Sequence, residues 1–91
     1  MSIEQRSRRI GITLDSKQGV IWQFKSQLSF PDYCTDNWDS FEECLLDFIV
    51  SSDELISIMH LTESSLSVED YDIYSSILSE AVKTGRFEVL E

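Results

Sequence analysis

The alternation of strand-like and helix-like segments limits this chain to very few folds. Three segments suit strands: residues 9–14 alternate apolar and polar, 54–60 hold a compact apolar run, and 86–90 close the chain. Between them, apolar residues recur at helical spacing over three stretches, 16–28, about 37 to 50, and 67 to about 82. A parallel pair of strands needs a long connection, which is usually a helix. We therefore predict an α/β fold of order β-α-α-β-α-β, with a three-stranded parallel sheet packed against three to four helices.

The ends of the predicted helices carry recognisable signals. Asp15 lies three residues before Gln18, a spacing typical of an N-cap. Pro31 breaks the first helix, because the residue before a proline is pushed out of the helical region. Ser67 and Asp70 have the spacing of a capping box and open the third helix. The buried face of that helix is expected to consist of Tyr71, Tyr74, Leu78 and Ala81.

The length of 91 residues allows a single domain, 1–91, of which we expect 1–8 to be a flexible N-terminus. Hydrophobic residues make up 42% of the chain, which is the composition of a globular domain and not of a disordered one. A domain of this size has little interior to spare for a deep pocket. We therefore expect no cofactor.

The charge of the chain points to its partners. The net charge is −10, and no Lys or Arg occurs between Lys25 and Lys83, where thirteen carboxylates fall. Such a surface repels nucleic acids and anionic lipids and attracts cationic proteins. No stretch approaches the ~18 apolar residues of a membrane span. We expect neither nucleic acid nor a membrane as partner.

Cys34 and Cys44 are the two cysteines of the chain. One possible pair is far from the disulfide framework of a small secreted domain. We interpret both as free thiols in a reducing compartment, with Cys44 as a small buried side chain and Cys34 in a loop. The expected localisation is therefore cytoplasmic.

Four carboxylates, which we call the acidic ridge, share one face of the second predicted helix. They are Asp36, Asp39, Glu43 and Asp47, spaced 3, 4 and 4 residues apart, with Glu42 at the edge and Leu46 close by. Like charges at i,i+4 destabilise a helix by about 0.2–0.5 kcal/mol per pair, so these placements bring no stability. One interpretation is a solvated face that aids solubility. The other is a docking surface for a cationic partner, with Leu46 as an apolar anchor.

Residue sets for catalysis or metal binding are missing. Asp39 and Glu43 could serve as an acid and a base, but a binding surface would crowd carboxylates in the same way. The single His60 ends a strand, and the serines occur without a G-x-S-x-G motif. EF-hand spacing and Cys/His clusters are also absent from the sequence. We expect neither an enzyme nor a metal site.

Residues 30–45 resemble the binding loop and second helix of the barstar family of intracellular ribonuclease inhibitors. Their sequence is Phe30-Pro31-Asp32-Tyr33-Cys34-Thr35-Asp36-Asn37-Trp38-Asp39-Ser40-Phe41-Glu42-Glu43-Cys44-Leu45. The Pro-x-Tyr and Asn-x-Asp spacings that lead into an acidic helix carry the resemblance. It is weaker over 77–81 and at Gly85. The family fold, a three-stranded parallel sheet with helices, agrees with the element order above.

The resemblance implies an intracellular inhibitor or immunity protein that occludes the active site of a basic, barnase-like ribonuclease or another cationic toxin. By position, Asp39 matches an acidic contact of the family, Glu43 matches its dominant acidic plug, and Glu80 an acidic contact on the last helix. The residues expected to bind the partner are Tyr33, Asn37, Asp39, Glu42, Glu43, Leu46, Asp47 and Glu80. The alternative is a barstar-like interaction domain with a different cationic partner and no ribonuclease inhibition. We expect a monomer when free, because isologous pairing through the acidic helix would bring like charges together.

Overall fold

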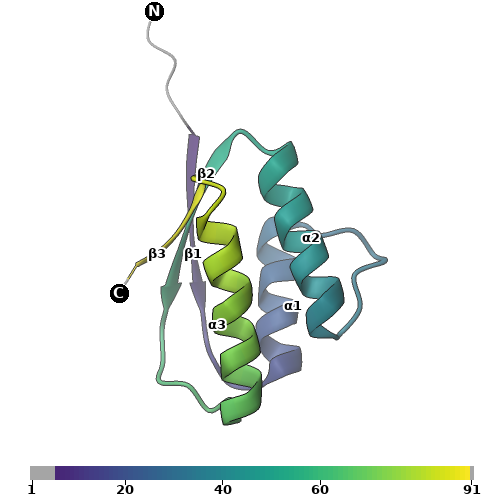
Figure 1. The fold of residues 1–91 in the computed structure, drawn as a ribbon, viewed down its shortest axis with the longest axis vertical. Coiled ribbons are helices and arrows are strands. Elements are labelled where there is room, and N and C mark those ends of the chain that lie inside the picture. Colours follow the sequence, from purple (N-terminus) through teal and green to yellow (C-terminus); the bar gives the residue numbers. More distant parts are fainter. Residues whose placement is uncertain (1–5, 91) are drawn as a thin grey trace, which may run out of the picture.

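The computed structural model describes residues 6–90, which form one parallel sheet and three helices (Figure 1). The elements are β1 (Arg6–Ile12), α1 (Lys17–Leu28), α2 (Trp38–Ser51), β2 (Glu54–His60), α3 (Val68–Val82) and β3 (Phe87–Leu90). The strands lie in the order β1-β2-β3, and in this register Ile58 pairs with Ile10 on one side and Val89 on the other. The predicted α/β fold and element order are confirmed, with three helices in the described part of the chain.

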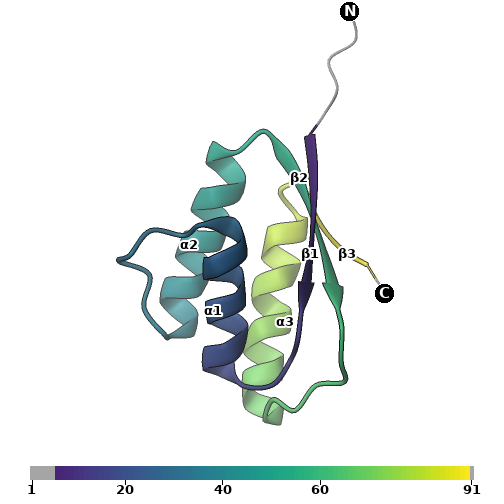
Figure 2. The same cartoon turned by 180° about the vertical axis from the view of Figure 1, so that it is seen from behind.

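All three helices cover the same face of the sheet (Figures 1 and 2). Their N-termini lie at the end of the molecule where β1 and β2 end, because each connection turns the chain back on itself. The core between the layers is formed by almost fully buried side chains: Ile12, Phe24, Phe41, Leu45, Ile49, Ile56, Ile58 and Tyr74. The rings of Phe24 and Phe41 pack edge to face, with 4.9 Å between their centroids. This packing anchors α2 by its apolar stripe and leaves its opposite face to the solvent.

The first strand begins earlier than the sequence predicted. Residues 6–8 belong to β1 and not to a flexible terminus, and residues 1–5 of that expected terminus lie outside the described residues. The reason is long-range pairing, because residues 6–8 lie in register with Glu54–Ile56 of β2. The Arg8 guanidinium adds an ion pair with Glu54 at 3.0 Å and donates to the Gln27 carbonyl oxygen. The strand ends at Ile12, before the predicted end at residue 14.

Of the two helix caps that the sequence predicted, Ser67 is confirmed and Asp15 is wrong. Asn37 caps α2 and Ser67 caps α3, each side chain accepting the backbone N–H three residues later. Helix α1 is capped by Ser16, which accepts from the Gly19 N–H, and not by Asp15. Residues 61–67 connect β2 to α3 without a helix.

The buried face of α3 differs from the prediction at two residues. Tyr71 is 44% exposed, and Ile77 is buried with Tyr74, Leu78 and Ala81. Tyr71 lies at the margin of the core, where it lines a surface pocket next to His60. The last strand begins at Phe87, one residue later than predicted.

Tyr74 makes the fold sensitive to alkaline pH. Burial raises the pKa of its phenol above the ordinary value of 10.0, and the nearby Tyr71 adds to the effect. The folded state keeps a proton that the unfolded state releases above pH 10, so this stability is complete below pH 10 and is lost as the pH rises. We expect the free energy of unfolding to fall by up to about 1.4 kcal/mol per pH unit above pH 10. Urea unfolding at a series of pH values measures this decline, which we expect for the unaltered protein and not for Tyr74→Phe. Equal declines in the two proteins would contradict the role of Tyr74.

Candidate protein-binding site

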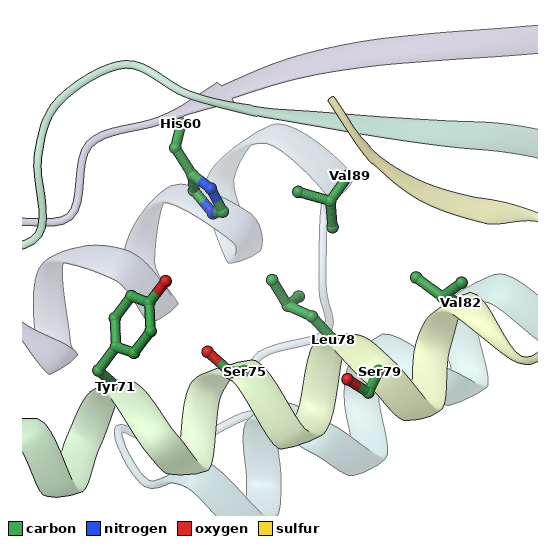
Figure 3. Close-up of a pocket in the computed structure, with 7 residues that line it drawn as sticks. All are labelled: His60, Tyr71, Ser75, Leu78, Ser79, Val82 and Val89. Atoms are coloured by element: carbon green, nitrogen blue, oxygen red, sulfur yellow. The ribbon is translucent and has the colours of Figure 1, made fainter. Parts of the chain in front are cut away.

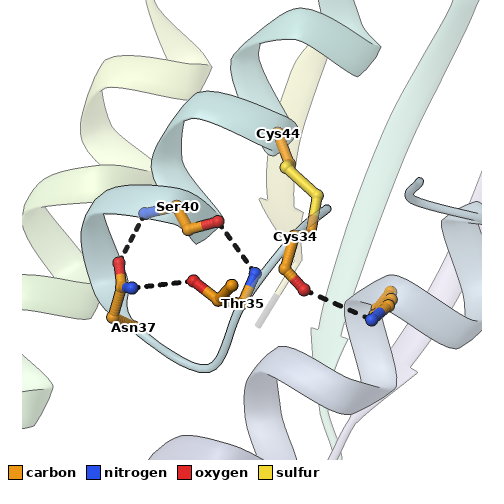
Figure 4. The surroundings of a disulfide bond; sticks show 6 residues. Cys34, Thr35, Asn37, Ser40 and Cys44 are labelled. Carbon is orange, nitrogen blue, oxygen red and sulfur yellow. Dashed lines mark hydrogen bonds between the residues drawn. A yellow bond between two sulfur atoms is a disulfide. The ribbon is translucent and has the colours of Figure 1, made fainter. Parts of the chain in front are cut away.

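The connection between α1 and α2, residues 29–37, projects from the helical layer and is held by local hydrogen bonds (Figures 1 and 4). Ser29 ends α1 in the left-handed conformation (φ 55°). The Thr35 N–H donates to Ser40 Oγ at 2.9 Å, and Asn37 Nδ2 donates to Thr35 Oγ1 at 2.8 Å. Lys25 Nζ donates to the Cys34 carbonyl oxygen at 3.2 Å. The loop therefore has a defined path, which presents Tyr33 to the solvent with 67% of its surface exposed.

A disulfide joins this loop to α2, between Cys34 and Cys44 (Figure 4). This finding overturns the prediction of free thiols. The loop folds back along α2 and brings the two Cα atoms to 6.5 Å, within bonding reach. Both residues are buried, with exposed fractions of 4% and 3%, so the expected burial of Cys44 is confirmed, and Cys34, in the loop as predicted, is buried too. The disulfide fixes the loop that carries Tyr33 relative to the helix that carries Glu43.

The structure places Asp39, Glu43 and Asp47 on one stripe of α2, where all three are exposed. Asp36 precedes the helix and is exposed in the loop, and Glu42 is half-buried. Within residues 7–90, the ion pairs are Arg8 with Glu54 and Lys83 with Glu80, so no described cation neutralises the ridge. Asp39 lies in the first turn, where the helix dipole favours a carboxylate, whereas Asp47 lies near the end, where the dipole opposes it. The ridge is a free anionic surface.

Three of the predicted partner-binding residues have contacts within the fold. Asn37 uses its side chain to cap α2 and to hold Thr35. Leu46 is half-buried and packs against the core, so it is not the exposed anchor that the sequence suggested. Helix α2 contacts both α1 and α3, and its buried arc is therefore wider than one stripe. Glu80 is exposed on α3 and pairs with Lys83 at 3.0 Å.

A groove of about 280 Å³ lies between α2 and α3 beside the ridge. Its walls are Trp38, Asp39 and Glu42 on α2 and Asp72, Ile73 and Ile77 on α3. The Trp38 indole N–H donates to Asp70 Oδ1 at 3.1 Å and links the two helices. The sequence did not predict this groove, because the pairing of α2 with α3 is a tertiary contact without a local signal.

A second pocket, of about 430 Å³, lies between α3 and the sheet near the ends of β2 and β3 (Figure 3). Three hydroxyl groups, of Tyr71, Ser75 and Ser79, face it together with His60. His60 Nε2 lies 2.9 Å from the Tyr74 hydroxyl group, so this histidine takes part in the packing of the core.

The described residues offer no metal site and no membrane span. In the part of the chain that the structure covers, no group of three or more His, Cys, Asp or Glu side chains is arranged to hold a metal ion. Within the same part, the helices are too short or too polar to cross a membrane.

One family model, described as Barstar (barnase inhibitor), matches residues 8–89. The match takes in every helix and all of the sheet except the first two residues of β1 and the last of β3. Searches of curated proteins and of solved structures find no match.

Proposed function

Because the chain belongs to the barstar family, we propose that it binds a basic ribonuclease and occludes its active site with the 29–37 loop and the acidic ridge. The observation that carries the proposal is the stripe of exposed carboxylates at Asp39, Glu43 and Asp47, which no described cation neutralises. The fold gains little from them: the helix dipole favours Asp39 alone, opposes Asp47, and the i,i+4 spacing sets like charges side by side. A partner whose cationic side chains face these carboxylates would explain why they share one stripe of the helix.

The proposed mechanism is steric blockade by groups that imitate RNA phosphate. A ribonuclease active site carries cationic side chains that hold the phosphates of its substrate, and a carboxylate can occupy the same position and accept the same hydrogen bonds. Glu43, near the middle of α2, is the proposed plug, and Asp39 lies one helical turn before it. Tyr33 frames one side from the loop. Glu42, Leu46, Asp47 and Glu80 are proposed to lie at the margin of the contact, and Asn37 acts by holding the loop.

A rigid loop favours tight binding. Ordering a mobile segment at an interface costs free energy, and a loop that is already fixed avoids this cost. The Cys34–Cys44 disulfide and the bond from the Thr35 N–H to Ser40 fix residues 34 and 35 before any partner arrives. We therefore propose that the 29–37 loop changes its shape little when the protein binds its partner.

The proposed compartment is the cytoplasm, because an inhibitor that protects the cell producing it must act where cellular RNA lies. Cytoplasmic thiols reduce accessible disulfides. The buried Cys34–Cys44 disulfide is compatible with this compartment, because thiol exchange needs access of the attacking thiolate to a sulfur atom, and the burial of both cysteines restricts that access.

The association rate should depend strongly on salt. With a net charge of −10, the protein attracts a cationic enzyme over distances that salt screens. We expect the association rate constant with a basic barnase-type ribonuclease to fall at least about tenfold between roughly 0.02 M and 0.5 M NaCl, with little change in dissociation. Stopped-flow fluorescence measures both constants. An association rate that does not respond to salt would contradict electrostatic steering.

A further inference from the structure

The Cys34–Cys44 disulfide joins the two segments of the proposed docking surface (Figure 4). In the sequence, Cys34 follows Tyr33 of the 29–37 loop, and Cys44 follows Glu43 of the acidic ridge. The bond therefore lies one residue away from the side chain that frames the contact and one residue away from the proposed plug. A change at the two sulfur atoms acts on the position of one segment relative to the other.

Cys34 attaches the outer part of the loop to the core. It is buried, whereas every other residue of 31–37 is exposed. The Cys34 N–H donates to the Pro31 carbonyl oxygen at 3.1 Å, which closes a turn around Tyr33. The Tyr33 side chain itself makes no hydrogen bond or ring contact with another described residue. The position of Tyr33 therefore depends on how firmly Cys34 is held.

Apart from the disulfide, single hydrogen bonds hold this turn. Lys25 Nζ donates to the Cys34 carbonyl oxygen, and the Thr35 N–H donates to Ser40 Oγ. The net contribution of one such hydrogen bond is small, because water competes for the same groups. We therefore expect that loss of the disulfide widens the range of positions that Tyr33 takes, while α2 stays in place through its own buried side chains.

A dithiol reductant opens such a bond by thiol–disulfide exchange. One thiolate of the reductant attacks the sulfur atom of one cysteine, and the other cysteine leaves as a thiolate and takes up a proton. The second thiol of the reductant then displaces the mixed disulfide, so the reductant departs as a disulfide and the protein keeps two thiols. Because Cys34 and Cys44 are buried, this attack needs a movement of the loop.

We propose that Cys34 and Cys44 form a redox-sensitive control of partner binding. The disulfide form is the state of high affinity, and exchange with a dithiol converts it to a state of lower affinity. The inference rests on the proposed function. A partner that binds the dithiol form must order the turn around Tyr33, and this ordering weakens the complex by about tenfold. Coupling between two sites is reciprocal, so a bound partner disfavours reduction by the same factor.

The first test compares the affinities of the two redox forms for a basic barnase-type ribonuclease that lacks disulfides. We expect an excess of dithiothreitol to weaken binding about tenfold. The double variant Cys34→Ala with Cys44→Ala should bind like the reduced protein and should not respond to the reductant. Ile58→Val is the matched control for lost stability, because it weakens the buried sheet and leaves the loop unaltered. Its affinity should differ from that of the unaltered protein by less than about twofold.

Circular dichroism establishes that each form is folded under the conditions of the binding measurement. Equal affinities of the folded disulfide and dithiol forms would overturn the redox control and leave the proposed function standing. No binding of the enzyme by the disulfide form would overturn the proposed function, and the redox control with it.

A second test needs no cysteine variant. The protein is equilibrated in a buffer of reduced and oxidised dithiothreitol, with and without a saturating amount of the enzyme, and the fraction of disulfide is measured by alkylation and mass spectrometry. We expect the enzyme to raise the ratio of disulfide to dithiol about tenfold. A ratio that does not change with the enzyme bound would overturn the coupling.

A third test needs no ribonuclease. Backbone order parameters of the isotope-labelled protein are measured by NMR in both redox forms. We expect the order parameter of Tyr33 to fall on reduction from about 0.85 toward about 0.6, and that of Leu45 in α2 to stay near the first value. An order parameter of Tyr33 that is the same in the two forms would overturn the redox control, whatever the enzyme does.

Discussion

Glu43→Ala is expected to weaken the inhibition of a basic barnase-type ribonuclease by roughly 30- to 1000-fold, the range of a strong interface hot spot. The reason is that Glu43 is exposed on α2 and forms no ion pair with another described residue, so we expect its carboxylate to act in the complex and not in the fold. Truncation would leave the cationic groups of the enzyme desolvated and without a partner, which is costly. Inhibition constants at fixed ionic strength measure the effect.

Two further variants separate charge from position. Glu43→Gln keeps the size of the side chain and removes its charge, and most of the loss should persist if the carboxylate imitates phosphate. Glu63→Ala removes the same charge from the exposed connection between β2 and α3, and it should change the inhibition constant less than about threefold, as for a remote screened charge. If Glu63→Ala and Glu43→Ala weaken inhibition equally, the effect comes from net charge alone and Glu43 is not a plug.

Opening the Cys34–Cys44 disulfide is expected to lower the free energy of unfolding by about 2–3 kcal/mol. The bond closes a loop over a sequence separation of 10, and a loop of this size restricts the unfolded chain by roughly that amount. For a domain of 91 residues this is a large part of the total stability. Urea unfolding of the protein with and without a thiol reductant measures the difference.

The matched control is the double variant Cys34→Ala with Cys44→Ala, whose stability should be low and indifferent to reductant. Alkylation followed by mass spectrometry establishes the state of the cysteines in each sample. The hydrogen bonds from Thr35 to Ser40 and from Asn37 to Thr35 do not involve the sulfur atoms, so we expect the loop to keep part of its order after reduction. Identical unfolding curves with and without reductant would contradict a stabilising disulfide.

Local signals predicted most of the fold. The apolar run in Glu54–His60 predicted the bounds of β2, and Ser67 marked the start of α3, because a strand of this kind and a side-chain cap are recognised within a few residues. Apolar periodicity placed the start of α2 at about residue 37, one residue before its first helical residue, Trp38. The start of β1 was missed because it depends on pairing with β2 and on the contact of Arg8 with Glu54, which lies 46 residues away.

The geometry of the candidate site was predicted only for the residues that a single helix carries. Asp39, Glu43 and Asp47 share a stripe because helical spacing alone places them there. Leu46, the disulfide and the groove required knowledge of what packs against α2, namely the returning loop and α3. Periodicity describes the face of one helix and carries no information on its neighbours.

The most direct test of the account is a titration of a basic barnase-type ribonuclease with this protein, with hydrolysis of RNA as the signal. The account predicts that activity falls in proportion to added protein and reaches zero near one-to-one stoichiometry. Binding of the enzyme with undiminished hydrolysis would contradict occlusion of the active site and favour an interaction domain for another cationic protein. Full activity with the protein in excess, together with no detectable complex, would contradict the proposed partner itself.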